Sequence, residues 1–109
     1  MKKFKSKEIE QDIRICGDFN DAPLSIARAR TKDVRADEKM HAHSNSFEYY
    51  MIISGTGEMI IDGNTISIGA GDVILVEPGE FHKITAVHQE LDYIVIREPS
   101  ADKIFPDAE

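Results

Sequence analysis

Two histidines, His41 and His43, stand two residues apart in a segment that the sequence predicts to be a strand. Side chains at positions i and i+2 of a strand point to the same face, so these two imidazoles form a chelating pair. Glu48 follows five residues after His43, and residues 44–46 between them are a turn-like string of Ser and Asn. This turn can fold the Glu48 carboxylate back beside the two imidazoles.

A third imidazole, His82, follows a Pro78-Gly79 turn at the start of a later predicted strand. Three imidazoles and one carboxylate form a mixed nitrogen and oxygen ligand set. Such sets favour divalent first-row metals over Ca or Mg. The sequence therefore predicts a site for a divalent transition metal, Fe, Mn, Ni, Co, Cu or Zn, without distinguishing among these ions.

Two further side chains are candidates for contact with a substrate. Tyr50 shares strand parity with Glu48 and can offer its hydroxyl to the site, and a core tyrosine with its hydroxyl at the rim fits the pattern equally well. Arg28 shares a strand face with Leu24 and Ile26. If that face is internal, the Arg28 guanidinium can clamp a substrate carboxylate; if it is external, Arg28 lies on an exposed strand.

The elements that must position these residues are predicted to be short strands. From residue 24 to 98, segments rich in β-branched residues alternate with glycine turns, which is typical of an antiparallel barrel or sandwich. We predict an all-β fold, a small antiparallel β-barrel or jelly roll, over residues 24–98. Residues 1–23 form an N-terminal arm or extra strand, and residues 99–109 form a C-terminal tail. The predicted strands are 24–31, 39–43, 47–54, 58–62, 65–68, 72–77, 82–86 and 91–97.

Glycines mark the predicted turns between these strands. Residues 55–57 and 69–71 supply positive φ, and residues 62–65 resemble a tight type I′ hairpin turn. Residues 49–53 and 73–76 are nearly continuous in apolar residues, where a half-exposed strand would alternate. Both faces of these strands should be covered, so we predict a homodimer.

Length and charge exclude several classes of protein. The 109 residues allow one domain, and 13 basic against 20 acidic residues give a net charge of −7. We expect neither nucleic acid nor a membrane surface as a partner, because the chain lacks a basic stripe. Cys16 is the single cysteine, which excludes an intrachain disulfide. No apolar run resembles a signal peptide or a membrane span, so we expect a cytoplasmic protein.

Two sequence motifs resemble those of the cupin family. The first is His41-Ala-His43, Glu48 and Gly55, and the second is Gly71, Glu77-Pro78-Gly79 and His82. The resemblance covers about residues 24–97 and implies a small β-barrel, a bound metal and a dimer. It also implies that the four metal ligands are His41, His43, Glu48 and His82.

The chain departs from the family pattern at turn and framework positions. Arg35 stands where the family has a glycine, Glu77 where it has a proline, and Ala86 where it has an asparagine. Every ligand position is filled. His88 fits neither motif, and we expect it in a surface loop.

The ligand set leaves two functional hypotheses from different classes. Four protein ligands on an octahedral metal leave two positions, enough for a bidentate substrate or for a substrate and dioxygen. The first hypothesis is a metal-dependent enzyme that oxygenates, isomerises or decarboxylates a small polar or aromatic molecule. The alternative is a non-catalytic module that binds metal or a small ligand. A sugar-processing cupin without metal fits less well, because the chain retains the whole ligand set.

Overall fold

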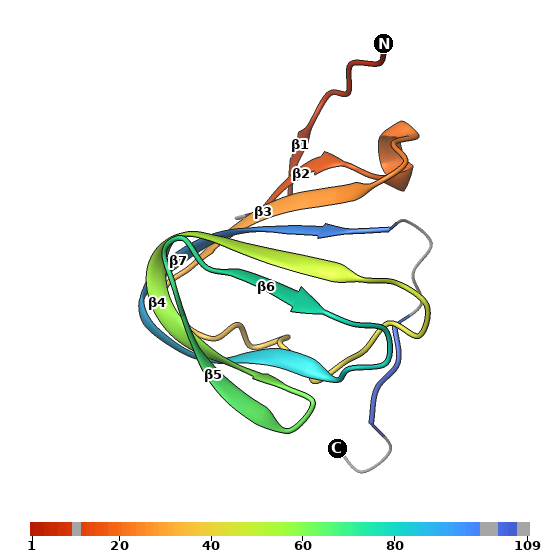
Figure 1. The fold of residues 1–109 in the computed structure, drawn as a ribbon. Helices are drawn as coiled ribbons and strands as arrows, with labels where there is room; N and C mark the ends of the chain where they lie inside the picture. Colours follow the sequence, from red (N-terminus) through yellow and green to blue (C-terminus); the bar gives the residue numbers. More distant parts are fainter. Residues whose placement is uncertain (10–11, 99–102, 107–109) are drawn as a thin grey trace.

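The computed structural model describes residues 1–9, 12–98 and 103–106, and its strands confirm the predicted all-β fold. Every strand pairing is antiparallel, in the order β1-β2-β3-β7-β4-β5, and β6 pairs with β4 (Figure 1). A 3-10 turn, η1 (Asp18–Asn20), precedes β3. The strands are β1 (Lys7–Ile9), β2 (Asp12–Cys16), β3 (Ser25–Thr31), β4 (Glu48–Ile61), β5 (Asn64–Gly69), β6 (Val73–Val76) and β7 (His82–Arg97).

Two long bent strands, β4 and β7, form the frame of the fold. They pair from Glu48 opposite Arg97 at one end to Ile61 opposite His82 at the other. Both strands curve back on themselves, so that the sheet closes into two facing layers (Figure 1). The register shifts at several points between Ile52 and Met59, and such irregularities increase the local bend of a strand.

The prediction of separate strands at 47–54 and 58–62, and at 82–86 and 91–97, was therefore wrong. Each pair is one continuous strand, because the predicted turn at residues 55–57 is a bend inside the ladder. Gly55 has a φ of 93°, and a Cβ there would lie 2.0 Å from the Glu90 carbonyl oxygen of β7. Only glycine allows the two backbones to approach so closely.

The other predicted elements differ less from those in the structure. The 39–43 segment makes isolated bridges, His41 with His82 and Ala42 with Ile104, and is not an extended strand. The hairpin turn lies one residue earlier than predicted: Asp62 and Gly63, between the paired residues Ile61 and Asn64, both have the positive φ that a type I′ turn requires at its two central positions. Gly71 also has positive φ, whereas Gly69 is the last residue of β5.

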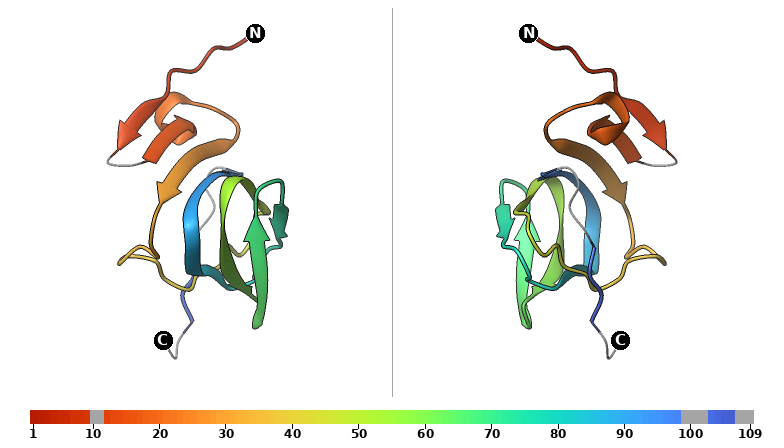
Figure 2. Two further views of the ribbon diagram at one scale, coloured as in Figure 1. Left: turned by 90° about the vertical axis from the view of Figure 1, so that its left-hand side faces the viewer. Right: turned by 90° about the vertical axis from the view of Figure 1, so that its right-hand side faces the viewer.

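The predicted N-terminal arm contains β1 and β2, which continue the sheet beyond β3 and stand away from the curved layers (Figure 2). Of the predicted tail, the described part is residues 103–106. No helix in the described part of the chain has the length and apolar character needed to cross a membrane.

The core lies between the two layers and is built from inward-facing side chains. Met59 and Leu91 are fully buried, which contributes about 1.5–3 kcal/mol for each side chain. Alternation along the strands decides which residues enter this core. The core residues are Tyr50, Ile52, Met59, Ile68, Val76, Ile84, Leu91 and Tyr93.

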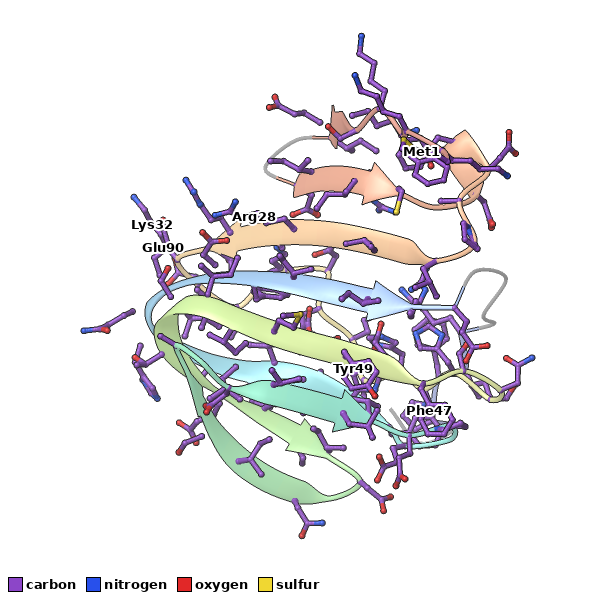
Figure 3. All side chains as sticks on the ribbon, turned by 45° about the horizontal axis from the view of Figure 1, so that its top comes forward. Met1, Arg28, Lys32, Phe47, Tyr49 and Glu90 are labelled. Atoms are coloured by element: carbon purple, nitrogen blue, oxygen red, sulfur yellow. The ribbon has the colours of Figure 1, made fainter. Side chains whose placement is uncertain are left out.

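The same alternation leaves an apolar surface on the outside of β4 and β6, with Tyr49 and Phe47 near the start of β4 (Figure 3). Tyr49 pairs with Leu75 and Met51 pairs with Val73, so these side chains are neighbours across the two strands. Between 39% and 58% of each residue is exposed. We call this surface the outer apolar face; it comprises Phe47, Tyr49, Met51, Ile53, Val73 and Leu75.

The bend gives a test of the fold. We expect Gly57→Ala to lower the free energy of unfolding by about 1–3 kcal/mol, because overpacking at a tight contact strains the backbone. The new Cβ would lie 2.4 Å from the Ala86 carbonyl oxygen of β7. Gly69→Ala is the matched control, since its nearest atom would be 3.7 Å away. Equal urea denaturation midpoints for the two variants would contradict this account of the bend.

Candidate metal centre

The predicted ligands meet at the end of the bent sheet where β4 and β7 begin, which we call its open end. Glu48 is the first residue of β4 and His82 is the first residue of β7. These residues pair at opposite ends of the β4–β7 ladder, yet His82 Nε2 lies 2.8 Å from Glu48 Oε1. The bend therefore creates the site by bringing the two ends of one ladder together.

His41 reaches the same place from a loop through a backbone bridge to β7. The His41 amide donates to the His82 carbonyl at 3.2 Å, and the His82 amide donates back at 2.9 Å. This exchange sets the two imidazole rings side by side, with centroids 4.4 Å apart. Ligand atoms of His41, Glu48 and His82 all lie within 4.8 Å of one another.

His43 lies next to this group. Its Nε2 is 3.7 Å from Glu48 Oε2, and its ring centroid is 5.5 Å from that of His41. His43, Glu48 and His82 are buried, each with at most 3% of its surface exposed. The structure thus brings all four predicted ligand residues into one cluster.

Backbone carbonyls orient two of the imidazoles. His41 Nδ1 lies 2.8 Å from the Lys39 carbonyl oxygen, and His82 Nδ1 lies 3.0 Å from the Glu80 carbonyl oxygen. Because a carbonyl oxygen only accepts, each Nδ1 carries the hydrogen and donates it. A neutral His41 ring then has its lone pair on Nε2, and His82 has its lone pair there once the proton that it shares with Glu48 is displaced. Metal-binding histidines are commonly oriented by such a hydrogen bond from the other ring nitrogen.

The electrostatics of the cluster suit a cation. Burial opposes the ionisation of Glu48, but the hydrogen bond from His82 and the nearby imidazoles outweigh it and lower the pKa of Glu48. Burial also lowers the pKa of His41, which keeps that ring neutral. For His82, the hydrogen bonds to Glu48 and to the Glu80 carbonyl outweigh burial and raise its pKa. Glu48 and His82 thus hold a proton between them, in a place where both could instead hold a divalent cation.

A cavity of about 180 Å³ adjoins the cluster, with His41 and Glu48 in its wall. Tyr50 also lines it, with its ring 5.8 Å from the His82 ring and stacked on Tyr93 at 6.0 Å. Burial and the charge of Glu48 raise the pKa of Tyr50 well above its ordinary value. Burial likewise raises the pKa of Tyr93 to about 12. Both phenols stay protonated at neutral pH and can donate hydrogen bonds into the cavity.

Arg28 is not part of this site. Ala27 and Ala29 of β3 line the cavity, so the side chain of Arg28 between them points to the outside of the sheet (Figure 3). There it donates two hydrogen bonds to Asp92, at 2.8 and 2.6 Å. The hydrogen bond and charge of Arg28 lower the pKa of Asp92. Of the two alternatives for Arg28, the structure shows the external one.

His88 is separate from the cluster and exposed, 2.9 Å from Glu58, but it lies within strand β7 and not in the predicted loop. Sequence reasoning missed three arginines that line the cavity, Arg14, Arg35 and Arg97. Arg35 forms a two-pronged ion pair with Asp12 at 2.8 and 2.5 Å. The parity of Arg97 with Tyr93 could have suggested a shared face, but not that this face is internal.

The cluster predicts which histidine a bound metal needs. We expect His41→Ala to lose most of its metal, because one imidazole lone pair is removed from a small ligand set. His88→Ala is the matched control and should retain the metal. Mass spectrometric metal analysis after purification without chelators measures this, and circular dichroism checks the fold. Equal metal content in the two variants would count against the site.

Comparisons with known proteins agree with this geometry. Residues 33–96 match the family described as the cupin domain, Cupin_2. The oxalate-binding protein of Thermotoga maritima is 33% identical over 58 residues, which are 52% of this chain and 48% of that protein. The match thus spans about half the length of this curated relative.

Solved structures of similar fold cover nearly the whole chain. A Streptomyces PAC13 variant with uridine has a TM-score of 0.71 at 14% identity, covering 100% of this chain and 98% of that one. A cupin protein from Bacteroides fragilis has a TM-score of 0.69 at 24% identity, covering 92% and 87%. The family match covers more than half of the sequence and includes all four predicted ligand positions, so this chain belongs to the cupin family.

Proposed function

We propose that this cupin holds one divalent transition metal ion through His41, His43, Glu48 and His82, and that a small polar molecule binds beside the ion. The observation that carries this proposal is the pair of oriented imidazoles facing a buried carboxylate in the wall of a cavity. When bound, the metal supplies a Lewis acid or a redox centre. The chain itself would hold and shield the ligand.

The cavity limits the ligand to a small molecule. Its volume of about 180 Å³ is below the range of roughly 300–1,000 Å³ that is usual for drug-sized ligands. Tyr50 would donate a hydrogen bond to the ligand. Two similar proteins, an oxalate-binding protein and a PAC13 variant that was solved with uridine, support a small polar ligand for this chain.

Two roles remain candidates for the loaded site, and each is favoured by a specific observation. A metal-dependent enzyme, of the oxygenase, isomerase or decarboxylase type, is favoured by the cavity beside the metal ligands, where Tyr50 would position a substrate. A non-catalytic binding module is favoured by the state of the two carboxylates in the cavity wall. Glu48 would hold the metal and Asp12 is held by Arg35, so neither carboxylate is free to transfer a proton in the loaded site. Conversion of candidate substrates by the loaded protein, with and without air, would decide between them.

The metal should stabilise the fold. We expect chelator-treated protein to melt at a lower temperature than protein loaded with a transition metal, because an ion that binds only the folded state stabilises it by mass action. At a free metal concentration of 100 times the dissociation constant, the free energy of unfolding rises by about 2.7 kcal/mol. Thermal melts with Mn, Fe, Co, Ni, Cu and Zn test it, with Ca and Mg as controls. If none of these transition metals raises the melting temperature of the protein, the metal site is refuted.

We also propose that the outer apolar face joins two copies of the chain. Its side chains form a continuous apolar surface across β4 and β6, and such patches on soluble proteins mark interaction sites. Light scattering should give about twice the chain mass of 12.2 kDa.

Tyr49→Lys should shift this dimer to monomer, because it places a charge in the contact. Val34→Lys is the matched control, since Val34 is 41% exposed but lies outside the face. A wild-type mass of one chain at micromolar concentration would exclude the dimer.

A further inference from the structure

We propose that Arg97 is an anion-binding residue of the cavity, and that the ligand of this cupin is therefore a small carboxylate. The inference rests on the proposed function, because it assigns a chemical class to the ligand of the same cavity. It depends on the placement of Arg97, on the buried Nε of its guanidinium that makes no hydrogen bond among the described residues, and on the charge of the cavity wall.

Arg97 ends β7 directly opposite Glu48, the first residue of β4. Both residues line the cavity. The guanidinium of Arg97 is thus placed beside the proposed metal ligands, at the open end of the bent sheet. A ligand in the cavity can contact Arg97 and the metal-binding side at once.

Arg97 differs from the other well-placed arginines in its hydrogen bonding. Its Nε, like that of Arg35, is buried and makes no hydrogen bond within the described part of the chain. Arg28 and Arg35, by contrast, each donate two hydrogen bonds to an aspartate. A buried donor without a partner is costly, so Arg97 has donor capacity that a ligand can satisfy.

The charge of the cavity wall also favours an anionic ligand. Three arginines, Arg14, Arg35 and Arg97, line it together with two acidic residues, Asp12 and Glu48. The wall is therefore net positive in a chain whose net charge is −7. Asp12 is paired with Arg35 and Glu48 with His82, which leaves Arg97 and the exposed Arg14 to attract an anion.

The size and lining of the cavity favour a carboxylate among small anions. The planar guanidinium fork matches the two oxygens of a carboxylate. Ala27, Ala29 and Val95 offer apolar wall beside it, which suits a short carbon chain. A cavity of about 180 Å³ accommodates an acid of a few carbon atoms.

The test compares two probes of the same shape on metal-loaded protein. Malonate carries two carboxylates, whereas malonamide is its neutral analogue. Isothermal titration calorimetry should show malonate binding at least tenfold more tightly than malonamide. Arg97→Gln should lower malonate affinity by about tenfold or more, because a hydrogen bond to a charged group is lost. The affinity for malonamide should change much less.

Arg30→Gln is the matched control. It removes the same formal charge from β3, but its side chain is 61% exposed and lies on the outside of the sheet with Asp92. It should bind malonate as the wild type does. Arg97→Lys keeps the positive charge but lacks the planar guanidinium. It should bind malonate with an affinity between those of the wild type and Arg97→Gln.

Metal analysis and circular dichroism on every sample separate the two proposals. If Arg97→Gln weakens malonate binding while the protein holds no metal, the role of Arg97 in anion binding is supported and the proposed metal centre is refuted. If metal is bound but Arg97→Gln and Arg30→Gln bind malonate equally, the metal centre stands and this inference is overturned. Tighter, Arg97-dependent binding of inorganic phosphate would overturn the carboxylate class.

Discussion

The antiparallel pairing of β4 with β7 is the interaction on which the rest of the structure depends. Glu48 and His82 stand at opposite ends of that ladder and still form a 2.8 Å contact. This is possible only because the ladder bends back on itself near Gly55 and Gly57, where the strand backbones approach too closely for any side chain. The polar cluster is therefore a consequence of the bend in the scaffold.

A buried carboxylate is costly unless neighbouring groups stabilise its charge. Glu48 receives that support from His82 and His43, and the Glu80 carbonyl fixes the His82 ring from the other side. Each group thus restricts the protonation state and orientation of the next. The result is a prepared cluster of donors, whose arrangement follows from backbone bridges as much as from the side chains themselves.

Alternation along the strands distributes the chemistry between two faces. On β4, Tyr50 points to the cavity while Tyr49 points to the outer apolar face. On β3, the alanines line the cavity and Arg28 is held outside by Asp92. A shift of one residue in the register would exchange these roles, so the pairing of strands determines which arginine can meet a ligand.

The sequence by itself determined the ligand types, their spacing, the all-β class and, to within one residue, the hairpin turn between β4 and β5, because these depend on local geometry. It did not reveal that residues 55–57 bend a single strand, since that depends on the close approach of β7. It also left open the face on which Arg28 lies. Parity along a strand is a local property, but which face is internal depends on partners far away in the sequence. For the same reason only the tertiary structure placed Arg97 opposite Glu48, because bulges in the β4–β7 ladder set that register.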